Sequence, residues 1–144
     1  MNTDNLKYLR EEKCLTQSEI ARDLNITRAA YSLWEINKNT IPLTQLNKLS
    51  NYFNVSMDYI IGISNIKKND NPCNEIDKVI LGKKLKQTRK ELHYTQEKLA
   101  NILNTTHSAI SAYENGITII PTLFLLKISQ LSKKSLSWFC SNNE

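Results

Sequence analysis

A stretch of 20 residues that occurs twice, at an offset of 79, constrains this 144-residue chain more than any other feature. Residues 16–35 align without a gap with residues 95–114, and nine of the 20 paired positions are identical. Chance pairing would give about one or two identities, so the two stretches form an internal repeat. The chain is therefore expected to fold as two similar small domains of roughly 60 residues, close to the lower size limit for a self-sufficient core.

Each copy of the repeat predicts two short helices separated by a tight break. In the first copy, Thr16 can cap a helix, and Glu19 stands at the capping-box spacing. Asn25 tolerates the left-handed conformation that often ends a helix, and Thr27 can cap the next one. Apolar residues recur between these signals at helical spacing. Four residues of the second helix are left facing outward: Arg28, Ala29, Ser32 and Leu33.

Both copies resemble the helix-turn-helix of the phage-repressor family (Cro/cI-type, also called Xre). The family pattern is Thr-Gln, two residues, Leu or Ile with Ala, a short break, and a helix ending in an aromatic residue or Leu followed by Glu. Asn-Gly often follows, as it does at 115–116, whereas the first copy departs there with Ile-Asn-Lys at 36–38. The resemblance covers residues 6–62 and 81 to about 141.

The resemblance implies an all-α fold of two tandem five-helix domains. We expect the first domain at 1–63, a polar linker at 64–74 and the second domain at 75–144. The first helix of the second domain should be the longer one. Five basic residues are expected on its outer side, either as a solvated face or as phosphate contacts: Lys83, Lys84, Lys86, Arg89 and Lys90.

In the family, the start of the third helix reads base edges in the major groove of double-stranded DNA. By position, the reading residues would be Thr27, Arg28, Ala29 and Ser32 in the first domain, and Thr106, His107, Ser108 and Ser111 in the second. Arg28 is the long donor among them and suits bidentate binding of guanine; otherwise it is an ordinary surface cation. The resemblance also implies phosphate contacts by Gln17, Gln96 and Lys38, the last replaced by Ile117 in the second domain.

Two arginine–glutamate pairs occur at the same separation of 25 residues, one in each copy. In the resembling repressors, these positions, Arg10 with Glu35 and Arg89 with Glu114, form a buried ion pair between the first and third helices. A bidentate arginine–carboxylate contact is geometrically specific. We therefore expect the pairs to be structural, holding the reading helix at its angle.

Charge and composition exclude several classes of protein. The net charge is +5, concentrated in the second domain, which is compatible with nucleic acid as a partner. No apolar run approaches the ~18 residues of a membrane span, and residues 1–4 do not begin a signal peptide, so we expect a cytoplasmic protein. The three cysteines lack metal-ligand spacing, and no catalytic motif occurs. We expect no enzymatic activity, metal, cofactor or small-molecule ligand.

The sequence thus predicts a sequence-specific DNA-binding transcriptional regulator, specifically a repressor. Two alternatives remain: a protein-interaction module, such as an antitoxin or the partner of an anti-repressor, or a protein in which one domain reads DNA and the other only dimerises. Four apolar residues replace polar counterparts around the fourth helix of the second domain and predict a homodimer interface there, unless they fill a larger core: Ile117, Ile119, Phe124 and Leu126.

Overall fold

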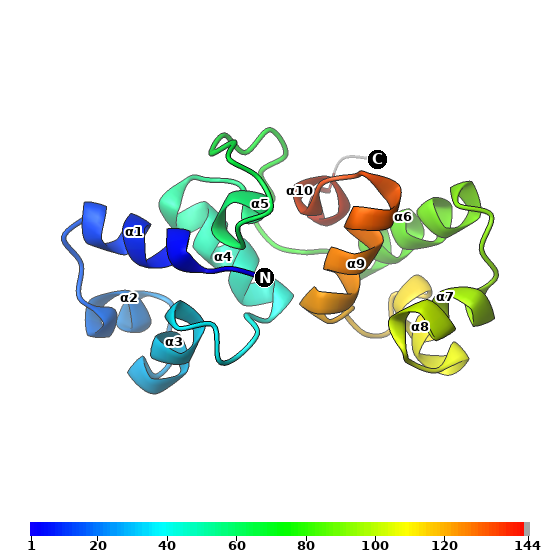
Figure 1. Cartoon of the computed structure of the whole chain (residues 1–144), viewed down its shortest axis with the longest axis horizontal. Helices are drawn as coiled ribbons and strands as arrows, with labels where there is room; N and C mark the ends of the chain where they lie inside the picture. The colour runs from blue at the N-terminus through cyan, green and yellow to red at the C-terminus, as the bar shows by residue number, and fades with distance from the viewer. Residues whose placement is uncertain (143–144) are drawn as a thin grey trace.

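The computed structural model describes residues 1–142, which contain ten helices and no strand. They form two groups of five, here called repeat one and repeat two (Figure 1). Repeat one comprises α1 (Asp4–Glu12), α2 (Gln17–Asp23), α3 (Arg28–Glu35), α4 (Leu43–Phe53) and α5 (Met57–Ile60). Repeat two comprises α6 (Lys78–Glu91), α7 (Gln96–Leu103), α8 (His107–Glu114), α9 (Thr122–Ser132) and α10 (Leu136–Cys140). The all-α fold with two five-helix units is confirmed.

Local sequence signals place the helix ends. The Thr16 hydroxyl accepts from the Glu19 backbone N–H, and the Glu19 side chain accepts from the Thr16 N–H, which completes the capping box. Thr27 caps α3 in the same way through the Ala30 N–H. The break between α2 and α3 contains Asn25 at φ +58°, and Asn104 occupies the matching position at φ +56°. Asparagine is one of the few residues that adopt this conformation readily.

The apolar faces of the helices meet in one buried cluster that includes side chains of both repeats. Leu6, Ile20, Leu46 and Leu49 are fully buried in repeat one, as is Leu125 in repeat two. Burial of such side chains is the main driving force for folding. No helix within residues 1–142 combines the length and apolar character that crossing a membrane requires.

The two repeats pack against each other through α5 and α10 (Figure 1). The buried Asp58 carboxylate accepts from the backbone N–H groups of Leu136 and Ser137 at the start of α10, at 3.0 and 3.4 Å. A second contact joins the loop before α4 to the first residue of α9, where the buried Thr122 hydroxyl donates to the Ile41 carbonyl at 2.6 Å. The repeats are thus in direct contact and are not separated by an extended linker.

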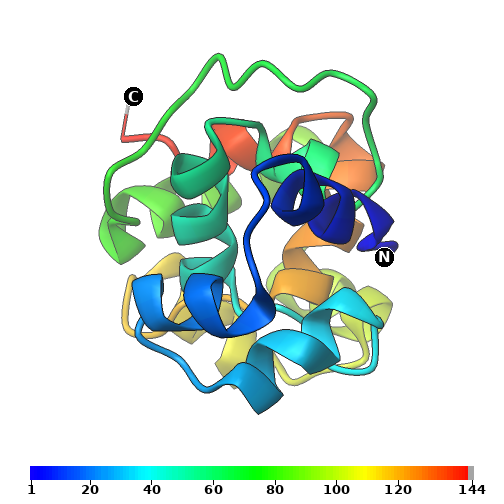
Figure 2. The same cartoon turned by 90° about the vertical axis from the view of Figure 1, so that its left-hand side faces the viewer.

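The segment between α5 and α6 follows the surface of repeat one (Figure 2). The Ser56 N–H donates to the Lys67 carbonyl at 2.7 Å. Further along, the amide groups of Asn47 and Asn51 on α4 both donate to the Cys73 carbonyl, at 3.0 and 2.7 Å. These bonds attach the linker to α4.

The four apolar residues around α9 that were expected to form an interface do not form one outward patch. Leu126 is buried at 7% exposure and belongs to the core, and Ile119 and Phe124 are half-buried against it. Ile117 alone of the four is well exposed, at 64%. The prediction treated polar counterparts as a sign of exposure. However, Asn47, the counterpart of Leu126, is itself buried, because its amide bonds the linker.

The basic residues of α6 do not all lie on its outer side. Lys83, Lys86 and Lys90 are exposed, but Lys84 is 5% exposed. Its Nζ donates to the carbonyls of Trp138 and Ser141, each at 2.8 Å. A cation at this place complements the carbonyl groups at the C-terminal end of α10. Lys84 therefore ties α6 to α10. Arg89 is also buried, in an ion pair described below.

Gly82 allows α6 to lie unusually close to the end of α8. A Cβ atom built on it would stand 2.6 Å from the carbonyl oxygens of both Tyr113 and Glu114. Its counterpart in repeat one is Thr3, whose hydroxyl donates to the matching carbonyl, that of Trp34, at 2.6 Å. The two repeats thus position the end of the third helix by different local means.

We predict that Gly82→Ala lowers the free energy of unfolding by about 1–2 kcal/mol. Overpacking costs typically 1–3 kcal/mol, and here the upper part of that range, about 2–3 kcal/mol, is expected because the Cβ would meet backbone oxygens at 2.6 Å; alanine returns roughly 1 kcal/mol of helix propensity. Urea denaturation followed by circular dichroism measures the change. The control is Lys83→Ala, at the next and exposed position of α6. If Gly82→Ala has the same free energy of unfolding as the control, α6 and α8 can move apart without cost, and their close approach does not contribute to stability.

Candidate nucleic-acid interface

Helices α2 and α3 pack together so that the N-terminal end of α3 points into solvent. Arg28 and Ala29 in its first turn are exposed, and Ser32 one turn later is half-buried. The opposite face holds Tyr31 and Trp34, which are buried in the core. Helix α3 therefore presents its first turn and one edge outward, and this surface contains the residues expected to read bases.

The exposed residues of α3 differ in which hydrogen-bonding groups remain available to a partner. The Thr27 hydroxyl already accepts the Ala30 N–H at 3.1 Å, so it caps the helix. The Arg28 guanidinium has no hydrogen-bond or ion-pair partner among residues 1–142, and Ala29 adds a small apolar surface beside it. Five N–H donors in a planar arrangement suit a guanine edge or a phosphate. Arg28 is thus the strongest candidate of this helix for contacting DNA.

Repeat two presents the same face with different chemistry. His107 and Ser108 are exposed at the start of α8, and Ser111 is half-buried. Thr106 caps α8 through the Ala109 N–H at 3.1 Å. The His107 Nε2 atom lies 2.6 Å from the side-chain oxygen of Gln96. His107 is therefore held against α7, while its counterpart Arg28 is unattached within the described chain.

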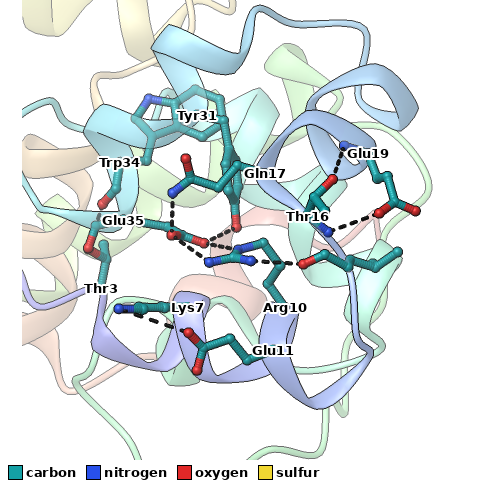
Figure 3. A network of polar contacts seen from close by, with 11 residues as sticks. Thr3, Lys7, Arg10, Glu11, Thr16, Gln17, Glu19, Tyr31, Trp34 and Glu35 are labelled. Atoms are coloured by element: carbon teal, nitrogen blue, oxygen red, sulfur yellow. Dashed lines mark hydrogen bonds and ion pairs between the residues drawn. The ribbon is translucent and has the colours of Figure 1, made fainter.

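A buried carboxylate anchors the end of α3 to the rest of repeat one (Figure 3). Arg10 binds Glu35 through two parallel contacts, Nε to Oε1 at 2.5 Å and Nη2 to Oε2 at 3.2 Å. The Tyr31 hydroxyl donates to Oε1 at 2.8 Å, and Gln17 Nε2 donates to Oε2, also at 2.8 Å. The Glu35 carboxylate thus joins α1, α2 and α3 at one point.

Repeat two contains the matching cluster with one donor fewer. Arg89 binds Glu114 through Nε at 2.7 Å and Nη2 at 3.0 Å, and Gln96 Nε2 donates to the same carboxylate at 3.1 Å. Ile110 occupies the position of Tyr31, so no hydroxyl reaches Glu114 from there. Both ion pairs that the resemblance to phage repressors implied are present. Their side chains are nearly buried, the arginines 12% and 10% exposed and both glutamates 2%.

The cluster in repeat one stabilises the charged form of Glu35. Burial alone would raise the pKa of Glu35, but hydrogen bonds from Arg10, Gln17 and Tyr31 together hold the pKa below its ordinary value. Burial and the neighbouring Glu35 carboxylate raise the pKa of Tyr31, so its hydroxyl stays protonated and can donate. Since the folded state favours ionised Glu35, this contribution to stability is present at neutral pH and is lost as the pH falls through the acid range.

The two glutamines have a structural task that sequence reasoning missed. Gln17 and Gln96 were expected to contact phosphate, yet each is half-buried and donates to the carboxylate of its own repeat. The missed signal was their fixed separation of 18 residues from Glu35 and Glu114. Phosphate contact remains a prediction for both glutamines, through the second N–H of Nε2 or the backbone N–H groups at the start of the helix, because the side-chain oxygen cannot donate to a phosphate.

The position three residues after the third helix of each repeat also distinguishes the repeats. Lys38 is exposed and follows Asn37, which has φ +58°. Asn37 donates its side-chain amide to the Met1 carbonyl at 2.7 Å. The counterpart of Lys38 is the exposed Ile117. Repeat one therefore places a positive charge beside its reading helix, where repeat two places an apolar side chain.

The rest of the described chain offers little other chemistry. Cys73 and Cys140 are buried free thiols and Cys14 is an exposed one. Burial raises the pKa of both Cys73 and Cys140, which makes these two thiols less reactive. Residues 1–142 contain no group of three potential metal ligands.

We predict strong coupling between Arg10 and Glu35. Arg10→Met and Glu35→Leu should each cost roughly 3–5 kcal/mol of unfolding free energy, because each leaves a buried charge unpaired. The double variant should lose less than the sum of the two single losses. Denaturant unfolding of the four proteins in the cycle measures the coupling.

The equivalent cycle with Arg89→Met and Glu114→Leu is the matched comparison. Glu114→Leu should cost less unfolding free energy than Glu35→Leu. It leaves Gln96 and Arg89 without their carboxylate partner, but no tyrosine hydroxyl. Strictly additive losses in both cycles would mean that the ion pairs do not stabilise either repeat.

Comparison with known proteins shows which family the chain resembles over both repeats. The family model described as Helix-turn-helix matches residues 6–60 and 85–139, once in each repeat and in the same register. The chain is 41% identical over 68 residues to the uncharacterized HTH-type transcriptional regulator YqaE of Bacillus subtilis (strain 168), covering 46% of this chain and 59% of the relative. It is 31% identical over 64 residues to YobD of the same organism, also named an uncharacterized HTH-type transcriptional regulator, covering 44% and 57%. The chain thus spans less than two thirds of each of these relatives.

Proposed function

The chain belongs to the helix-turn-helix family, and from that premise we propose that it is a sequence-specific DNA-binding transcriptional regulator. The observation that carries the proposal is the exposed first turn of α3, held by a buried ion pair and presenting the Arg28 guanidinium, which has no partner among residues 1–142. The names of the two relatives agree with this function. Action on DNA also fits a cytoplasmic location.

The fixed angle of the reading helix supports base reading. An α-helix fits the major groove, but its side chains discriminate bases only if the helix keeps one angle to the groove. The Glu35 and Glu114 clusters fix that angle by joining the first three helices of each repeat. The reading residues of the proposal are Thr27, Arg28, Ala29, Ser32, Thr106, His107, Ser108 and Ser111.

The finer parts of the proposal depend on the resemblance to phage repressors. Repression follows if the protein occupies sites that overlap promoters. A homodimer and an anti-repressor partner stay predictions, and the homodimer is the alternative to operator binding by a single chain. The contact between the two repeats already brings two reading helices together in one chain, as a dimer would.

We predict that DNA binding weakens by on the order of 10³ between 50 and 200 mM salt, if six or more phosphates are neutralised. Fluorescence anisotropy with genomic fragments and with random duplexes measures the dependence. The control is the unfolding free energy across the same salt range, which should change far less. A flat titration, or no binding to any duplex, would favour the alternative that these repeats hold another protein.

We predict that Arg28→Ala relaxes the preference at one base pair by about 1–3 kcal/mol. The matched control is Lys38→Ala, which removes the same charge from an exposed position beside the same helix. Lys38→Ala should weaken all sequences alike, as loss of a phosphate contact does. Gln17→Ala is a poorer control, because it also removes a donor to Glu35. Equal weakening of every sequence by Arg28→Ala would reassign Arg28 to phosphate.

A further inference from the structure

The contacts between the repeats join matched positions or matched segments. Asp58 and Ser137 differ in number by the repeat offset of 79, and they touch each other: the Ser137 N–H and hydroxyl both donate to the Asp58 carboxylate. The second contact has the same property. The groove between the repeats is lined by residues 40–44 from repeat one and residues 119–122 from repeat two, and these segments are counterparts.

A surface that packs against its own counterpart is characteristic of a two-fold axis. In a symmetric dimer, such a self-complementary interface relates the two subunits by a half-turn. Here one contact joins exact counterparts, the other joins counterpart segments, and both lie within one chain, which is the pattern of an approximate two-fold axis that passes near Asp58 and Ser137. The axis is only approximate, because carboxylate and hydroxyl are not equivalent.

The approximate axis places both reading helices on one side of the molecule. In Figure 1, α3 and α8 lie along the lower edge at opposite ends, whereas α5 and α10 meet in the upper middle. Both reading helices remain at the lower side when the molecule is turned by 90° (Figure 2). Dimeric helix-turn-helix proteins use such an arrangement to read two half-sites on one face of the duplex.

The linker holds this arrangement in place. Cys73, the last buried residue before repeat two, is bonded through its carbonyl to Asn47 and Asn51 of α4. Lys84 then ties α6 to the C-terminal end of α10, and the N-terminal end of α10 contacts Asp58. The separation between α3 and α8 is therefore set by packing. Two readers on a flexible linker would have no such fixed separation.

The reading faces are nonetheless unlike. Arg28 and Ala29 in repeat one correspond to His107 and Ser108 in repeat two, and His107 is drawn against Gln96. A long planar donor and a short imidazole match different base edges. The two half-sites should therefore differ in sequence even though the protein scaffold is close to symmetric.

We propose that a single chain acts as a covalent dimer: one copy binds one operator composed of two unlike, oppositely oriented half-sites at one fixed spacing. This inference rests on the proposed function. The expected spacing is about one helical turn, roughly 10 base pairs or ~34–36 Å between half-site centres. A second copy of the chain is not needed for operator binding.

The test is selection of bound duplexes from a random DNA library with the full chain, followed by measurement of the mass of the complex. We expect one 16.6 kDa chain per duplex and one asymmetric motif with constant spacing. Two chains per duplex, identical half-sites or variable spacing would each overturn the covalent-dimer proposal while leaving DNA-binding intact. Selection of no sequence at all would overturn both this proposal and the proposed function.

A pair of matched variants sharpens the test without touching the core. His107→Arg with Ser108→Ala gives α8 the reading residues of α3, and Arg28→His with Ala29→Ser makes the reverse exchange. All four positions are exposed, so both proteins should fold. Each variant should change one half-site only and make the selected motif more nearly palindromic. A variant that alters both halves, or neither, would overturn the assignment of one half-site to each repeat.

Discussion

The buried arginine–glutamate pair is the interaction on which each repeat depends. Glu35 lies at the end of the reading helix and collects donors from α1, α2 and α3, so one carboxylate sets the mutual angle of three helices. Helices of seven to nine residues are too short to be stable alone in water. Burying the Glu35 charge is costly unless all its donors are in place. The ion pair therefore favours the arrangement of these helices that brings the donors together over other arrangements that bury as much apolar surface.

The repeats share this device but differ in how the third helix is fixed at its end. Repeat one uses the Thr3 hydroxyl and the Tyr31 hydroxyl, whereas repeat two uses the close approach at Gly82 and a longer first helix. Repeat two also has Lys84 as a second internal cation. Part of the positive charge of the second half, that of Lys84 and Arg89, is therefore structural, and net charge alone is a poor measure of which repeat contacts DNA.

The contact between the repeats determines how the two duplicated domains can act together. Two separate domains would read two sites independently, with a spacing limited only by the linker. Because Asp58 touches its own counterpart Ser137, duplication and fusion have instead produced an internal version of a two-fold interface. Divergence of the two reading helices then becomes possible without loss of the paired scaffold, an option that two identical subunits do not have.

The sequence by itself determined the repeat and its helix caps, because these depend on residue types at short or repeated spacings, and its resemblance to phage repressors supplied the all-α five-helix fold and both ion pairs. Asn25, Thr16 and Glu19 act within one or two turns, so local chemistry suffices to predict them. The burial of Asn47, Lys84 and Leu126, and the pairing of the repeats through Asp58, depend on segments 26 to 79 residues apart. Only the tertiary structure decided these, because a side chain is polar or apolar in sequence but buried or exposed only in relation to what packs against it.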